Sequence, residues 1–227
     1  MRVLAIDTAL AACSAAVLDT SYGGIIASES LPMPRGHAEA LMPLLARVMK
    51  ESDMTFHDID RVAVTIGPGS FTGLRVGIAA ARGIGLATGK PVVGVSTLCA
   101  YAAPRRDADH NDRIVAAIDA RHSHVYMQVF DCGGATLAAP RLAPLSEAVR
   151  AASDIASCIV GSAAQAVADE LSKTAAKSVT VDARPAPDIV WVARIGATLR
   201  EDKAPAKPLY LRAPDAQPQS AASLPRR

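Results

Sequence analysis

The sequence predicts an α/β protein of two lobes, each built on a mixed sheet flanked by helices. Three short apolar segments open the chain, and alternating helical and strand patterns follow them. The same order begins again after a polar, charged segment at 105–112, which we interpret as a linker. A chain of 227 residues is long enough for two lobes of about 100 residues each. We therefore expect an N-terminal lobe over 1–104, a C-terminal lobe over 105–202 and a proline-rich tail over 203–227.

The first lobe opens with a meander of three strands, since short apolar runs alternate with turns and Gly23-Gly24 supplies the second turn. Leucines at helical spacing then predict a helix, and a second helix of small residues follows a Gly/Pro loop. The expected elements are strands at 2–6, 14–18 and 25–31, a helix at 37–51, a strand at 61–66, a helix at 71–88 and a strand at 91–95.

The second lobe repeats this order with shorter elements. The expected elements are a strand pair over 114–130, a strand at 135–142, a helix from Ser146, a strand at 157–160, a helix at 162–172, a strand at 178–181 and a helix at 187–200. Beyond them, we expect the apolar residues 208–212 to dock on the body and the last dozen residues to be disordered.

The two halves indicate an internal duplication. Shifting the chain by 112 positions without gaps aligns six identical residues within seventeen positions. The matches are Val3, Ala5, Ile6, Asp7, Val17 and Asp19 with Val115, Ala117, Ile118, Asp119, Val129 and Asp131. Chance remains an alternative, because alanine and valine are abundant in this chain.

Composition excludes several classes of protein. Half of the residues are hydrophobic and the net charge is +2, which favours neither disorder nor strong electrostatic binding of nucleic acid. The first residues read as strands and not as a signal peptide, and no apolar run reaches the length of a membrane span. We expect a soluble, cytoplasmic protein without a membrane partner.

Cysteines and histidines give little support to a metal site. Cys13, Cys99, Cys132 and Cys158 are widely spaced among apolar residues, so we expect buried, reduced thiols. His122 and His124 would share one face of a strand, but no third ligand follows at a suitable spacing. We therefore predict no metal site, and solvated histidines at the start of a strand.

A Gly-Pro-Gly turn precedes the small-residue helix. Gly67, Gly69, Ser70 and Thr72 form a candidate anion-binding loop, since a helix N-terminus has unpaired amides and the positive end of the dipole. Either hydroxyl can cap the helix. A well-capped turn without a ligand is the alternative, and it is the better supported one because the loop lacks the Gly-Lys-Ser/Thr of a P-loop.

Within the helix itself, Gly73, Gly77, Ala81 and Gly85 recur every fourth residue. They form a face almost free of side chains, on which another element can approach closely. Internal packing and packing across a subunit boundary both fit this pattern.

Residues 65–75, TIGPGSFTGLR, together with LAIDTA at 4–9, GKPVVGVSTL at 89–98, IDARHSHVY at 118–126 and PLYLR at 208–212, closely resemble the TsaB (YeaZ) family. The resemblance implies two actin-like lobes of the ribonuclease H-like clan of actin, Hsp70 and sugar kinases. It also implies a paralogue of TsaD, the subunit that transfers threonylcarbamoyl to adenosine 37 of tRNAs reading ANN codons. TsaD and the ATPase TsaE are the implied partners.

The same resemblance implies lost catalytic groups. Thr97 and Tyr101 stand where TsaD has its pair of metal-binding histidines, and neutral hydroxyls bind metals poorly. After Gly161, Ser162 replaces the second glycine of the clan's adenosine loop, which weakens a nucleotide site there. His124 departs from the TsaB pattern, which places an acidic residue nearby. Asp7 and Asp119 end strands where clan enzymes hold metal-bound phosphates, but an Asp turn bonding its own backbone fits better.

We therefore expect a non-catalytic scaffold subunit whose helices at 37–51 and 71–87 pack on TsaD, or on a second copy when TsaD is absent. tRNA would be met only through the complex, and ATP or ADP would sit at the complex interface through TsaE, with no cofactor of the chain's own. The alternative is a small-molecule kinase or ATPase of the same clan. The candidate contact residues are Leu41, Leu45, Val48, Leu74, Ile78 and Arg82.

Overall fold

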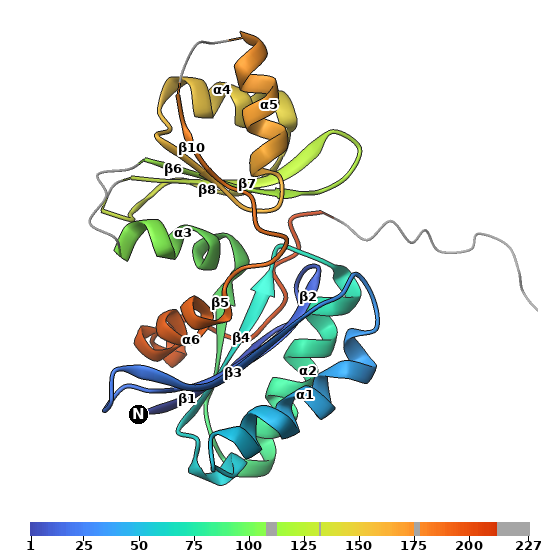
Figure 1. Ribbon diagram of the computed structural model, residues 1–227, viewed down its shortest axis with the longest axis vertical. Helices are drawn as coiled ribbons and strands as arrows, with labels where there is room; N and C mark the ends of the chain where they lie inside the picture. Colours follow the sequence, from blue (N-terminus) through green and yellow to red (C-terminus); the bar gives the residue numbers. More distant parts are fainter. Residues whose placement is uncertain (108–112, 132, 175–177, 213–227) are drawn as a thin grey trace, which may run out of the picture.

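The computed structural model describes residues 1–107, 113–131, 133–174 and 178–212 (Figure 1). Their elements, in chain order, are β1 (Arg2–Asp7), β2 (Ala12–Asp19), β3 (Gly24–Pro32), α1 (His37–Glu51), the 3-10 helix η1 (Phe56–Asp58), β4 (Arg61–Gly67), α2 (Phe71–Thr88), β5 (Val92–Ser96), α3 (Thr97–Asp107), β6 (Ile114–Asp119), β7 (His124–Phe130), β8 (Thr136–Pro144), α4 (Leu145–Asp154), β9 (Cys158–Val160), α5 (Ala164–Thr174), β10 (Thr180–Asp182), α6 (Ile189–Thr198) and η2 (Glu201–Lys203). None of these helices is long and apolar enough to cross a membrane.

Two mixed sheets of five strands have the same topology. The first runs β3-β2-β1-β4-β5 and the second runs β8-β7-β6-β9-β10. In each, the first three strands in chain order pair antiparallel and the last two join in parallel. The predicted α/β fold of two lobes with mixed sheets is confirmed.

Each sheet is covered on both faces. Leu4 and Ile6 of β1 pack with α1 and α2, and the alternate residues Val3 and Ala5 pack with α6 on the other face. In the second sheet, α4 and α5 cover one face and α3 covers the other. The buried core is therefore divided into two layers in each lobe.

The third helix of each half covers the sheet of the other half. Leu98 and Tyr101 of α3 pack against the second sheet, although α3 directly follows β5 of the first. Val192 and Ala193 of α6 pack against the first sheet, although α6 follows β10. Figure 1 shows α6 beside β1 and β4, with α3 beneath the second sheet. The expected boundaries 1–104 and 105–202 are therefore wrong for these helices, because their apolar faces are buried across the linker.

Arg61 fastens α6 to the first lobe. Its Nη1 donates hydrogen bonds to the carbonyl oxygens of Gly196, Ala197 and Leu199 at 3.0, 3.3 and 2.8 Å. Its Nη2 lies 3.1 Å from Oε1 of Glu201. A cation at the C-terminus of a helix satisfies carbonyls that have no partner within the helix.

The repeated topology supports the predicted duplication, but the ungapped alignment is one residue out of register in the first strand. Leu4 faces α1 and α2, whereas Ala116, 112 positions later, faces α3. A shift of one residue moves every side chain of a strand to the opposite face. In the next strand the alignment holds, since Val17 and Val129 both face the paired helices of their lobes.

The ends of the expected elements are mostly accurate. The helix expected from residue 37 to 51 is α1, and the helix expected from 71 is α2. The expected linker at 105–112 is helical through Asp107, and its remaining residues lie outside the described part, as do the terminal residues expected to be disordered. The expected docking of 208–212 is confirmed, since Leu209 donates its amide to the carbonyl of Ile66 at 2.7 Å.

Candidate functional site

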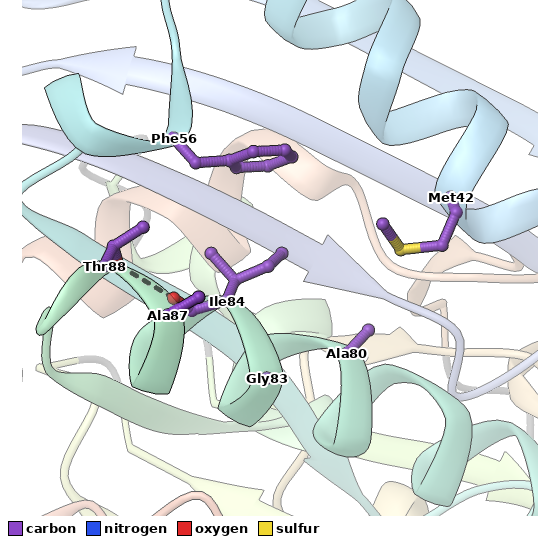
Figure 2. Close-up of a pocket in the computed structure, with 7 residues that line it drawn as sticks. All are labelled: Met42, Phe56, Ala80, Gly83, Ile84, Ala87 and Thr88. Atoms are coloured by element: carbon purple, nitrogen blue, oxygen red, sulfur yellow. Dashed lines mark hydrogen bonds between the residues drawn. The ribbon is translucent and has the colours of Figure 1, made fainter.

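An open apolar groove of about 360 Å³ lies between α1, η1 and α2 (Figure 2). Its lining residues are Met42 of α1, Phe56 of η1 and Ala80, Gly83, Ile84, Ala87 and Thr88 of α2. The only hydroxyl in the lining, that of Thr88, donates to the carbonyl of Ile84 at 2.8 Å. The groove therefore offers an apolar surface whose polar side chain is already satisfied.

On the α2 side the groove is open, because most of the residues that line it there are small. Nothing lies within 4 Å of a Cβ atom added at Gly83, so this position opens directly into the groove. The side chain of Met42 on α1 is 53% exposed. On α2, Leu86, which precedes the lining residue Ala87, is 88% exposed. Small residues on a helix face allow a second helix to approach closely. The groove is thus shaped for an apolar helical ridge.

The predicted contact residues do not form this surface. The five apolar ones lie in the core of the first lobe with at most 4% of their surface exposed, packed between the helices and the sheet. They are Leu41, Leu45, Val48, Leu74 and Ile78. As contact residues these five are therefore wrong, because the apolar stripe of each helix is used internally. Arg82 is exposed on α2.

The glycine face of α2 is also used internally. A Cβ atom at Gly73 would collide with the carbonyl oxygen of Thr8, and one at Gly77 would collide with the hydroxyl of the same residue. Thr8 in turn donates its hydroxyl to the carbonyl of Gly73 at 2.7 Å. Packing of this face across a subunit boundary is therefore wrong. The glycines admit the β1–β2 loop against the helix.

The Gly67–Thr72 loop is a capped turn. Gly67-Pro68 is a cis peptide bond, and Ser70 is the N-cap, its hydroxyl accepting from the amide of Gly73 at 3.2 Å. The Ser70 amide donates to the carbonyl of Ala9 at 2.7 Å. Two of the local amides thus have partners within the chain. Anion binding by Gly67, Gly69, Ser70 and Thr72 stays a prediction.

Asp7 is fully buried at the end of β1. Its Oδ1 accepts from the Ala9 amide at 3.0 Å and from the Thr65 hydroxyl at 2.6 Å. Within the described residues its Oδ2 has no hydrogen-bond partner. Burial raises the pKa of this carboxyl above its usual value, although both hydrogen bonds lower it. A buried carboxyl whose Oδ1 is held by its own loop and by Thr65 is poorly placed to bind a metal-bound phosphate.

Asp119 is exposed and makes the Asp turn expected of it. Its Oδ1 accepts from the Arg121 amide at 2.8 Å. The Asp119 amide donates to the hydroxyl of Ser162 at 3.1 Å, so the serine that follows Gly161 contacts this strand end. A Cβ atom at Gly161 would collide with the backbone of Ala117, and the close approach requires glycine there. Ser162 and Gly161 therefore tie two strands together.

Thr97 and Tyr101 occupy the first turns of α3 and are buried. The Tyr101 ring belongs to the core of the second sheet, and its hydroxyl donates to the carbonyl of Arg184 at 2.9 Å. Burial raises the pKa of the phenol far above its usual value. The side chain that stands at the second histidine position is therefore a packed, neutral tyrosine.

The histidine pair does not share a strand face. His122 lies in a turn with φ of 51°, and the Nδ1 of His124 lies 2.7 Å from the carbonyl oxygen of His122. Among the described residues, no three His, Cys, Asp or Glu side chains gather closely enough to hold a metal ion. Cys13 and Cys158 are buried, Cys99 is half-buried, and Cys132 lies outside the described residues.

The groove residues were missed because the apolar pattern of a helix identifies its buried face. Met42 follows Leu41 and breaks the spacing of the core residues, and Gly83 falls outside the four-residue glycine series. An apolar residue on the outer face of an amphipathic helix is the signal that indicates such a surface.

Two sheets of identical strand order, each covered by a helix pair and an exchanged third helix, define an actin-like α/β protein. The family model described as TsaD: tRNA N6-adenosine threonylcarbamoyltransferase matches residues 10–217. The chain therefore belongs to this family.

Within the family, the predicted resemblance to TsaB is confirmed. TsaB of Escherichia coli is 40% identical over 126 residues, which cover 56% of this chain and 53% of that protein. YeaZ from Pseudomonas aeruginosa has a TM-score of 0.73 at 25% identity, covering 92% of this chain and 99% of that one. An uncharacterized protein of Mycobacterium tuberculosis is 36% identical, covering 95% of this chain and 94% of that one. The chain spans about half the length of the curated TsaB proteins it matches.

Proposed function

We propose that this chain is a non-catalytic subunit required to form the threonylcarbamoyl group on adenosine 37 of ANN-reading tRNAs. It acts in the cytoplasm as a scaffold for TsaD and TsaE and meets tRNA through the complex. It forms a homodimer when alone. The names of the curated relatives, tRNA threonylcarbamoyladenosine biosynthesis proteins, support the pathway. The scaffold role rests on the groove between α1 and α2.

The apolar lining of the groove supports the docking of a paralogous subunit. A TsaD subunit of the same fold would present an equivalent helix pair, and paired equivalent surfaces are the geometry of an ancestral homodimer. The small residues of α2 admit an apolar ridge, and the exposed Arg82 lies outside the lining of the groove. Burying this apolar surface provides the driving force for association.

The proposal assigns no cofactor to the chain itself and places ATP or ADP at the interface formed with TsaE. The kinase or ATPase alternative is less well supported. That alternative needs Asp7 as a charged phosphate or metal ligand, but Asp7 is buried, its Oδ1 accepts hydrogen bonds from Ala9 and Thr65, and burial raises its pKa, which disfavours the charged form.

Docking is tested with Gly83→Glu. Glutamate is a better helix former than glycine, so the fold is retained, while its carboxylate enters the groove. Calorimetry with cognate TsaD should show affinity weakened by about tenfold or more, since a buried, unpaired charge costs several kcal/mol. Ala166→Glu, at an exposed position of α5, is the matched control and should bind as the parent does. Undiminished affinity of Gly83→Glu would remove the groove from the interface.

The pathway is tested separately by depleting the protein in its host and quantifying tRNA nucleosides by mass spectrometry. Loss of threonylcarbamoyladenosine is expected, and re-expression of the parent chain should restore it. Unchanged threonylcarbamoyladenosine after depletion would contradict the proposed function.

A further inference from the structure

Residues 204–212, which we call the strap, lie along β5 and the end of β4 in the first sheet. The Gly94 amide donates to the carbonyl of Ala204 at 2.9 Å, and Val93 pairs antiparallel with Pro205. Farther along, the Leu209 amide donates to the carbonyl of Ile66 at 2.7 Å. The strap is thus held to β5 and β4 by backbone hydrogen bonds.

Two glycines of these strands leave the room that the strap occupies. A Cβ atom at Gly94 would lie 2.7 Å from the carbonyl oxygen of Pro205, and one at Gly67 would lie 3.0 Å from that of Leu209. Both contacts are with backbone atoms, which cannot rotate away. The strap therefore packs closely against the backbone of both strands.

An aromatic stack anchors the strap on the first turn of α2. The rings of Tyr210 and Phe71 lie 5.1 Å apart between centroids. The Arg75 guanidinium lies 3.8 Å above the centre of the Phe71 ring, and its Nε donates to the Tyr210 hydroxyl at 3.0 Å.

Two residues beyond Tyr210 the strap reaches the second lobe. Nη1 of Arg212 donates to the carbonyl of Ala120 at 3.3 Å, directly after β6. This carbonyl directly precedes the turn formed by Arg121, His122 and Ser123, all of which have positive φ. In Figure 1 the strap, in red, rises from the first sheet toward the junction with the second.

From these contacts we propose that the strap is a conformational lock, which holds the two lobes at a fixed angle. The chain itself passes between the lobes at two places, before α3 and before α6. Two covalent connections allow a hinge motion of one lobe against the other. The strap adds a further non-covalent connection beside the packing of α3 and α6, anchored on α2 at one end and on the β6–β7 turn at the other. This inference does not depend on which partner occupies the groove.

The lock is tested by pulsed electron paramagnetic resonance on the full chain. Spin labels are attached through p-acetylphenylalanine introduced at Lys50 in α1 and at Ala166 in α5, which are exposed in different lobes. Tyr210→Ala removes the first-lobe anchor and Arg212→Ala removes the second-lobe anchor. Tyr22→Ala removes an aromatic side chain that is 87% exposed and serves as the control.

The parent and Tyr22→Ala should give the same narrow distance distribution. Tyr210→Ala and Arg212→Ala should each give a broader distribution with added population at other distances, while circular dichroism stays unchanged. Broadening by both variants supports the lock, because they break opposite ends of one connection. Distributions that match the parent in both variants would overturn it, as would broadening by Tyr210→Ala with a parental distribution in Arg212→Ala.

Discussion

Asp7 and Asp119 accept the same backbone hydrogen bond in the two lobes, from the amide two residues later, at 3.0 and 2.8 Å. They nevertheless point to different faces of their sheets. Asp7 shares its strand face with Val3 and Ala5, which pack on α6, whereas Asp119 shares its strand face with residues that pack on α4 and α5. One is fully buried and the other is exposed. Identical residues at equivalent strand ends therefore have different electrostatic environments.

Asp7→Asn should stabilise the protein at neutral pH. Burial raises the pKa of Asp7 in the folded protein above the pKa it has in the unfolded chain. The stability that this shift contributes is complete below the unfolded pKa and is lost as pH rises through the folded pKa. Asparagine keeps an acceptor for the Ala9 amide and the Thr65 hydroxyl and carries no charge. Urea unfolding should show the variant exceeding the parent at pH 7, with the difference shrinking toward acid. A variant less stable than the parent at pH 7 would contradict this.

Asp19→Asn should show the opposite sign. Hydrogen bonds from Ser21 and Arg2 lower the pKa of Asp19, the Ser21 amide making the largest contribution. Its contribution to stability is therefore present above the unfolded pKa and is lost as pH falls through the folded pKa. The variant should be less stable than the parent at neutral pH, and the difference should vanish in acid. Urea unfolding over the same range of pH measures the difference in stability between the parent and each of the two variants.

Gly73→Ala and Gly83→Ala should differ in sign although both lie in α2. At Gly73 the added methyl group meets the rigid carbonyl of Thr8, and such overpacking costs about 1–3 kcal/mol. At Gly83 it meets open space, and replacing glycine by alanine inside a helix gains about 1 kcal/mol. Chemical denaturation monitored by circular dichroism measures both. Equal changes in the free energy of unfolding would show that the Thr8 carbonyl moves away to make room for the added methyl group.

Arg61→Met should loosen α6. Methionine replaces the buried stem but leaves the carbonyls of Gly196 and Leu199 without their donor, at a cost of about 1–3 kcal/mol. Hydrogen exchange should accelerate in α6 more than in α5. Arg200→Met is the control, because the Arg200 pair with Asp202 is mostly exposed and such pairs contribute about 0–1 kcal/mol. Equal exchange in α6 of the two variants would contradict the anchoring role.

Tyr101→Phe should destabilise the protein modestly. The ring packing is kept, while the Arg184 carbonyl loses the hydroxyl that donates to it at 2.9 Å, which costs about 1 kcal/mol. Tyr22→Phe, at an exposed position, should change the thermal midpoint little. A thermal shift that is the same for both would show that the Tyr101 hydroxyl carries no net stabilisation.

The sequence predicted the elements well because the periodicities are local. The helix α2 begins directly after the N-cap Ser70 of the predicted glycine loop, and α1 begins at His37, where the helical spacing of apolar residues placed it. The helical spacing also predicted that Leu41 and Ile78 would be buried. We expected a partner to cover them, whereas they pack within the first lobe. Helical spacing identifies a buried face without identifying what covers it. Only the three-dimensional arrangement shows that η1 and the outer side of α2 leave a groove.

For the same reason, local sequence patterns could not predict that α3 and α6 each cover the sheet of the other half. Nothing in the spacing of Val192 and Ala193 distinguishes burial on one sheet from burial on the other. The register of the duplication failed at the first strand because abundant alanine and valine make a one-residue shift hard to detect.

The reciprocal placement of α3 and α6 is that of a domain-swapped dimer joined into a single chain. Each half carries the cover for a face that belongs to the other, so a chain cut between α3 and β6 would leave both fragments with an apolar sheet face in water. The two fragments should be insoluble or disordered apart and should regain structure when mixed. Duplication in this molecule therefore made its halves mutually dependent, and not merely adjacent.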